Sequence, residues 1–458
     1  MPITGQLSAD TRLMPWNDIR FIGPVIAIPP ATFAILLLWQ GDLGWAFRAA
    51  QLCLGWAVIV QLAFLLPRIF DRGWFELFAY LLHFVAIGAA SLTVTFRLEQ
   101  YGQDLLYDQL AVAGMAGQLM LGFLVLNGAP LRLRAELNRQ VLAAAAVVVC
   151  SAALVKFALY IQYVGLAGGH FSIYTEGDAV RDNSPAVIRI LAAGAPLIGL
   201  LAVTQPGLPR WCRMLGVLAI MLEFAIGIRG RPVYIILSAL AIAQVHIRIT
   251  PARKIAILIS GVLAVIAIGS VGYVREENTS EIDEYFWMVL ESLFGIFEAG
   301  VFSAQLPGAS PLVLTQGIVL LAPTPIGSID TVAKLISVVY TQKAYLVGYG
   351  YSSSVLTETV LLFGPLGAGL VYPAAVFGIT VAIKAAVSSR RTWLFLYGAC
   401  VLPIAFYIWR AELWQLAVPA VKALPFIVVL VGADAYARLG KDRPALRLPL
   451  PTSNPRVS

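Results

Sequence analysis

The stretch VLAAAAVVVCSAALVKFALYIQY, from Val141 to Tyr163, carries one charged side chain, Lys156, in an otherwise largely apolar run. A helix needs about 20 such residues to cross the ~30 Å hydrocarbon core of a bilayer. A strand of a membrane barrel would instead show about ten residues of alternating polarity. The run therefore predicts a transmembrane helix.

The composition of the whole chain agrees with this prediction. Of 458 residues, 59% are hydrophobic and 12% are charged, with a mean hydropathy of +0.82. A soluble domain carries about 25% charged residues, so this chain cannot supply a polar shell for a core of its size. A soluble enzyme, a disordered protein and a secreted disulfide scaffold are excluded. The four cysteines show no metal-ligand spacing, and we expect them to be free thiols.

Similar runs recur along the chain and predict an all-α polytopic integral membrane protein with about 12 transmembrane helices. The expected spans are 22–40, 50–67, 74–96, 109–127, 141–163, 186–204, 211–228, 232–247, 255–273, 353–383, 392–409 and 416–436. We expect residues 1–436 to form a single transmembrane domain. Residues 437–458, rich in proline and basic side chains, read as a cytoplasmic tail.

Basic residues mark alternate ends of these spans, which fixes the expected orientation. The predicted inner loops hold Arg68, Arg72, Arg132, Arg134, Arg139, Arg210, Arg213, Arg248, Arg253, Lys254, Lys384, Arg390 and Arg391. Because cytoplasmic loops collect arginine and lysine, both termini should be cytoplasmic. The net charge of +7 is then mainly a topology signal, and no nucleic-acid partner is expected.

Two long segments fall on the predicted outer side. Residues 274–352 form a large lobe between the ninth and tenth spans, and residues 164–185 form an acidic loop that contains His170. Within the lobe, residues 286–302 resemble an amphipathic helix that lies in the membrane interface. Whether the lobe is interfacial or re-entrant stays open.

Two arginines contradict the orientation rule at the turn Gly227-Ile228-Arg229-Gly230-Arg231-Pro232. Guanidinium groups bind phosphate through two hydrogen bonds and keep their charge when partly desolvated, so Arg229 and Arg231 are candidate ligands of a pyrophosphate. The alternative is a pair of arginines that reach outer-leaflet headgroups.

Three further charged residues lie at or near the outer ends of predicted spans. Arg410 is either a third phosphate ligand or a structural partner of Glu412. Glu358 lies about one turn into a span, and an ionisable side chain at membrane depth is a functional candidate by default. The alternative for Glu358 is a carboxylate neutralised by a buried arginine.

Motifs of soluble phosphate and metal enzymes are absent from the sequence. It has no Walker loop, no HExxH motif and no carboxylate cluster with magnesium-site spacing, so no metal or cofactor is expected. His170 is a candidate base, although a lone loop histidine is more often solvated. Outer aromatic side chains such as Tyr351 could stack on sugars or belong to an interfacial aromatic belt.

The order of these features resembles the Wzy-type polymerases of lipid-linked oligosaccharide repeat units, including the O-antigen and enterobacterial common antigen polymerases. The resemblance covers mainly residues 220–435 and rests on short motifs. Arg229 and Arg231 match the family's arginine turn, and Arg410 matches its late arginine. Gly350, Ser354, Glu358, Phe363, Gly364 and Gly367 match its glycine-serine-glutamate stretch. The segment Ala322–Gly327 lacks the basic, tryptophan-containing sequence of many relatives.

The resemblance implies a metal-independent glycosyltransferase of the bacterial inner membrane with its active site facing the periplasm. Such enzymes transfer a growing glycan from undecaprenyl pyrophosphate to a sugar hydroxyl of a second carrier-linked unit. Arg229 and Arg231 would stabilise the leaving pyrophosphate, with Glu358 as the general base and Glu412 or His170 in reserve. Gly350, Ser354, Tyr351 and Arg410 would contact the substrate. Membrane lipids are expected partners, and a chain-length regulator is a further partner left open.

Three other readings remain. An O-antigen ligase shares the same arginine chemistry and differs in its acceptor. A flippase for the same lipid-linked sugar would show two similar halves and short loops, neither of which the sequence has. A structural membrane scaffold would require internal partners for the outer arginines.

Overall fold

The computed structural model describes residues 43–69, 73–96, 105–127, 131–133, 135–164, 183–225, 230–245, 249–260, 300, 304, 354–409 and 414–442. These residues form helices and the connections between them, with no strand among them, as the sequence predicts. The helices are α2 Leu43–Ile69, α3 Trp74–His83, η1 Phe84–Gly88, α4 Ala89–Phe96, α5 Leu105–Asn127, α6 Arg139–Val164, α8 Ala186–Ala193, α9 Ala195–Thr204, α10 Arg210–Ala225, α11 Gly230–Ala243, α17 Val355–Val387, α18 Thr392–Val401, α19 Ile404–Tyr407 and α20 Trp414–Asp442.

Within the described part of the chain, five helical stretches are long and apolar enough to cross a membrane. They are Arg48–Leu65, Trp74–Phe96, Leu106–Leu126, Arg139–Tyr163 and Val355–Val387. A sixth is added if α8 and α9, which are bent by 43°, form one broken span. These helices are consistent with a multi-pass membrane protein. The number of twelve spans, the side of each terminus and the outer lobe stay predictions.

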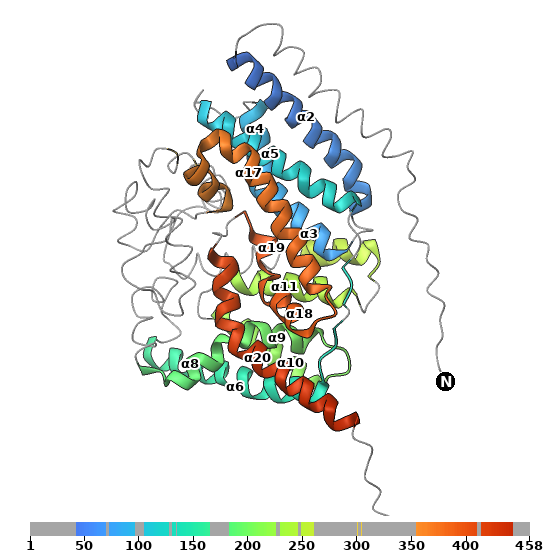
Figure 1. The fold of residues 1–458 in the computed structure, drawn as a ribbon, viewed down its shortest axis with the longest axis vertical. Coiled ribbons are helices and arrows are strands. Elements are labelled where there is room, and N and C mark those ends of the chain that lie inside the picture. The colour runs from blue at the N-terminus through green and yellow to red at the C-terminus, as the bar shows by residue number, and fades with distance from the viewer. Residues whose placement is uncertain are drawn as a thin grey trace, which may run out of the picture.

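Two groups of helices are visible in Figure 1. Helix α17 lies along α5, with α2 and α4 beside them, and α9 packs against α10 and α6. Helix α3 contacts α5 of the first group, and α11 contacts α9 of the second. The short helix α19 contacts both α3 and α11 and so connects the two groups.

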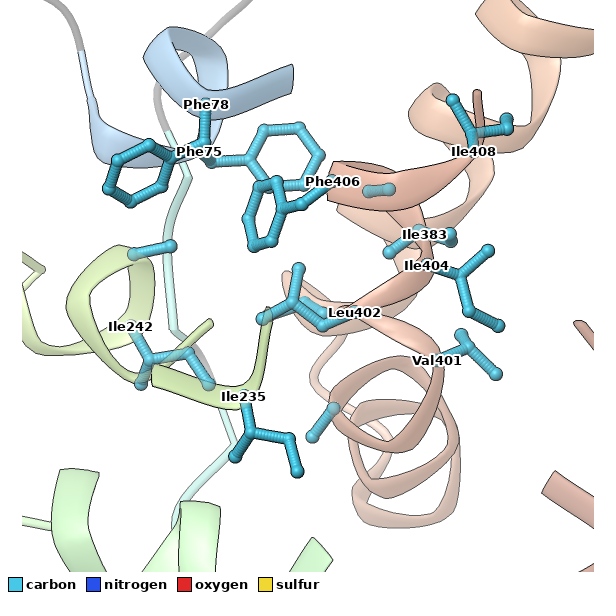
Figure 2. Packing of buried hydrophobic residues seen from close by; sticks show 14 of the residues in the cluster. Phe75, Phe78, Ile235, Ile242, Ile383, Val401, Leu402, Ile404, Phe406 and Ile408 are labelled. Atoms are coloured by element: carbon cyan, nitrogen blue, oxygen red, sulfur yellow. The ribbon is translucent and has the colours of Figure 1, made fainter. Parts of the chain in front are cut away.

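A buried aromatic cluster forms this connection. The ring of Phe406 in α19 meets Phe75 and Phe78 of α3 edge-on, with centroids 5.8 and 5.6 Å apart. Ile235 and Ile242 of α11 and Ile383 of α17 belong to the same packed cluster (Figure 2). Lipid tails are as apolar as these side chains, so the hydrophobic effect does not drive helices together in a bilayer. Close packing of this kind is what stabilises helix association there.

Polar contacts pair helix ends that the sequence assigns to one side of the membrane. At the predicted inner side, the amide N–H of Trp74 donates to Gln244, and that of Asn138 donates to Asp434 at 2.8 Å. At the predicted outer side, Arg48 pairs with Asp108 at 3.4 Å. The alternation of helix directions is therefore consistent within the described ranges, whereas which end faces the cytoplasm is not tested.

The ends of α3 and α17 are joined by a buried ion pair between Glu76 and Lys384. Glu76 is 2% exposed, and Nζ of Lys384 also lies 5.6 Å from the ring centroid of Phe75. The second carboxylate oxygen, Oε2, is buried without a hydrogen-bond partner. A buried charge that loses its partner is strongly destabilised, so this pair makes the two helix ends depend on each other.

We expect Lys384→Met to lower the free energy of unfolding by about 3–5 kcal/mol, because it leaves Glu76 buried and unpaired. The double variant Glu76→Gln/Lys384→Met should recover most of that loss. Thermal unfolding of the purified variants, followed by tryptophan fluorescence, measures both effects. A single variant as stable as the wild type would contradict a stabilising role for the pair.

Candidate functional site

The beginning of α17 places Ser354 and Glu358, two predicted site residues, on the first turn of one helix. Ser354 is the N-cap, and its Oγ accepts a hydrogen bond from the amide N–H of Thr357 at 3.2 Å. The hydroxyls of Ser354 and Thr357 are 3.0 Å apart. The amide of Glu358 donates to the carbonyl of Ser354 at 3.0 Å, which starts the helical ladder. A cap serine and a first-turn carboxylate both stabilise a helix N-terminus.

This first part of α17 is buried on every side. Residues 354–361 are all buried, including the charged Glu358 at 3% exposure. An amphipathic helix on a protein surface would expose one face. The polar side chains Ser354, Thr357, Glu358 and Thr359 therefore lie inside the protein at the end of a membrane helix.

Helix α17 is broken at Gly364, where the backbone leaves the helical conformation with φ 72° and ψ 170°. L-residues with a side chain rarely adopt this conformation, and the following Pro365 has no N–H to continue the ladder. Figure 1 shows the resulting change of direction along α17.

The break divides α17 into two parts with different roles. Residues 365–387 would extend about 34 Å at 1.5 Å per residue, which is enough to cross a bilayer alone. Phe363, Leu366 and Leu370 near the break are exposed, as expected of side chains that face lipid. Residues 355–363 thus form a short additional helix that ends in a break, an arrangement that in membrane proteins occurs where the backbone is enclosed by protein or lines a cavity.

A cavity of about 60 Å³ lies among α8, α9, α11, α18, α19 and α20. That volume is enough for about four water molecules. Its lining is mostly apolar, with Tyr407, Cys400 and Lys422 as the polar exceptions. Cys400 donates to the backbone carbonyl of Pro419 at 3.3 Å, and Tyr407 packs against Tyr234 with ring centroids 4.7 Å apart.

The cavity lies close to the two predicted arginine turns along the chain. Helix α11 begins at Gly230, so position 231 precedes the cavity residue Ile235 by one helical turn. Position 410 follows the cavity residue Tyr407 by three residues. The backbone at position 231 therefore lies about 6 Å, along the α11 axis, from that of the cavity residue Ile235.

Most of the other predicted site residues lie outside the described residues. These are His170, Arg229, Gly350, Tyr351, Arg410 and Glu412, and for Arg231 only the backbone is described. The structure brings Ser354 and Glu358 together and leaves the remaining assignments as predictions. Among the residues that it describes, no three His, Cys, Asp or Glu side chains are arranged to hold a metal ion.

A buried polar network between α3, α5 and α17 was not predicted from the sequence. His83 contacts Gln118 through Nδ1 at 2.6 Å and the hydroxyl of Tyr372 through Nε2 at 2.9 Å. Gln118 also donates to the carbonyl of Tyr80 at 3.4 Å. His83 directly precedes the π-helical turn Phe84–Gly88. A histidine within an apolar run was visible in the sequence, but its partners come from spans far apart along the chain.

The chain matches no protein-family model, no curated protein and no solved structure.

We expect Gly364→Ala to destabilise the protein by about 1–3 kcal/mol, because alanine is strained at this positive φ. No atom lies within 4 Å of the added Cβ, so a steric clash would not explain the loss. Gly369→Ala is the matched control, since it is equally open and lies within the regular part of α17. It should leave stability unchanged or raise it slightly. Equal midpoints of thermal unfolding for the two variants would contradict the proposed constraint at Gly364.

Proposed function

We propose that the protein is a glycosyltransferase that polymerises lipid-linked oligosaccharide repeat units at the periplasmic face of a bacterial inner membrane. The donor is a growing glycan on undecaprenyl pyrophosphate, and the acceptor is a sugar hydroxyl of a second carrier-linked unit. The observation that carries the proposal is the buried turn with Ser354 and Glu358 at the start of a broken membrane helix. The resemblance of the surrounding motif to the Wzy-type polymerases supports it.

In this proposal Glu358 is the general base. The acceptor oxygen attacks the anomeric carbon of the donor, and its proton passes to the Glu358 carboxylate. The bond between the anomeric carbon and the pyrophosphate oxygen breaks, and the carrier leaves as a pyrophosphate. Burial of Glu358 supports this role because a water-poor site keeps hydrolysis from competing with transfer to the sugar.

Arg229 and Arg231 are the proposed partners of the leaving pyrophosphate, and Arg410 is a third. The main catalytic requirement is to neutralise the charge that develops on this group, which guanidinium groups can do without a metal. The backbone at position 231 lies one helical turn before the cavity residue Ile235, which supports the assignment. Gly350, Tyr351, Glu412 and His170 remain proposed glycan contacts.

A flippase for the same lipid-linked sugar is the second candidate. Helices interrupted by a break near membrane depth also occur in transporters, where they line the substrate site. The break at Gly364 is the specific observation that favours this candidate. A ligase is the third, because it differs from a polymerase only in the acceptor.

We expect Glu358→Gln to abolish long-chain glycan in a strain that carries the variant as its only copy, because the amide cannot accept the hydroxyl proton. Glu358→Asp should retain part of the product. Glu136→Gln, at an exposed glutamate on the predicted inner side, is the matched control and should give wild-type chains. Electrophoresis of the lipid-linked or lipid A-linked glycan measures the chain lengths.

Membrane levels of each variant are measured in parallel, so that loss of product is separated from loss of protein. A wild-type ladder from Glu358→Gln would contradict the role of Glu358 as the base. Accumulation of untransported units inside the cell would instead support the flippase.

A further inference from the structure

The connection between α5 and α6 includes residues 131–133 and 135–139, which we call the basic strap. Leu131, Ala135 and Leu137 are buried at 8%, 8% and 3% exposure, whereas Arg132 and Glu136 are exposed. This alternation fixes one edge of the segment against the protein and leaves the other edge open.

Hydrogen bonds join the basic strap to the ends of three helices. The amide of Arg132 donates to Ser388 in the turn between α17 and α18 at 3.4 Å. Gln205, after α9, donates to the carbonyl of Leu137 at 3.4 Å. Arg438 near the end of α20 donates to the carbonyl of Glu136 at 2.6 Å. The strap therefore holds the ends of α9, α17 and α20 along one edge.

Among the described residues, six arginines other than Arg438 lie on the basic strap, on the turn after α17 or at the start of α10. Arg132 is close to the turn with Arg390 and Arg391, because its amide bonds Ser388. Arg139 lies over Gly207, whose φ is 79°, and the Arg139 Cζ would be 2.3 Å from a Cβ at this position. Arg210 and Arg213 begin the next helix, α10, three and six residues beyond Gly207.

These arginines differ from Arg438, which pairs with Asp434 at 2.9 Å. No ion pair to a carboxylate is present for Arg132, Arg139, Arg210, Arg213, Arg390 or Arg391 within the part of the chain that the structure describes. The Nε of Arg213 is also buried without a hydrogen-bond partner. The surface thus gathers guanidinium groups that form no ion pair with a carboxylate of the described residues.

We infer that the basic strap and its neighbouring turns bind the phosphate groups of anionic phospholipids, such as phosphatidylglycerol, in the adjacent membrane leaflet. Guanidinium groups pair with phosphate through two charge-assisted hydrogen bonds. The surface lies at the ends of apolar helices, where headgroups are found, and basic pockets between membrane helices are known to bind such lipids. This inference does not depend on the proposed glycan transfer.

The test is a titration of the full-length purified chain with phosphatidylglycerol, followed by native mass spectrometry and by thermal unfolding. Phosphatidylcholine provides a lipid without net charge, and inorganic phosphate provides the free anion. The variant is Arg139→Gln/Arg210→Gln. The control is Arg189→Gln, which removes an exposed arginine of α8 on the predicted outer side.

Wild-type protein should retain phosphatidylglycerol and gain thermal stability from it, with no such effect of phosphatidylcholine or inorganic phosphate. Each basic residue near a headgroup contributes about 1 kcal/mol, so the variant should bind phosphatidylglycerol at least about tenfold more weakly. The control should stay within about twofold of the wild type. Equal retention of both lipids, equal stabilisation by inorganic phosphate, or equal weakening in the control would each overturn the inference. The wild-type comparison of the two lipids holds even if the variant does not fold.

Discussion

The break of α17 at Gly364 is the constraint on which the other features depend. It separates a buried short helix, which begins at Ser354 and carries Glu358, from a part long enough to cross the membrane. The long part then places Tyr372 in hydrogen-bonding contact with His83, and Lys384 in an ion pair with Glu76. If the helix continued straight through Gly364, the beginning and the end of α17 could not both keep these positions.

The few polar side chains inside the apolar helices serve to fix helix positions. His83, Gln118 and Tyr372 join α3, α5 and α17, and Glu76 and Lys384 join α3 to the far end of α17. In a bilayer these contacts specify which helices meet, because apolar contacts alone do not distinguish a neighbouring helix from lipid. Arginines that form no ion pair within the described part of the chain gather instead at the helix ends, as in the basic strap.

The sequence predicts the helices well because a run of apolar residues of membrane length has few other structures available. The described helices begin and end close to the predicted spans, and the helix ends that contact one another are those predicted on one side. Glu358 is a candidate because a carboxylate in an apolar run is costly, and its position after a cap serine can be predicted from the local sequence. The break at Gly364 was not predicted, since a Gly-Pro pair within a span does not reveal the sign of φ. The pairing of Glu76 with Lys384 depends on the packing of residues about 300 positions apart, which no local pattern encodes.

The glycan profile of a strain that lacks this protein tests the central claim most directly. If the protein polymerises lipid-linked repeat units, the strain should attach single repeat units to the final lipid. It should make no chains of more than one unit. Unchanged chain lengths would contradict the proposed polymerase. Carrier-linked polymer that is never attached to lipid A would identify a ligase instead, and repeat units confined to the cytoplasmic side would identify a flippase.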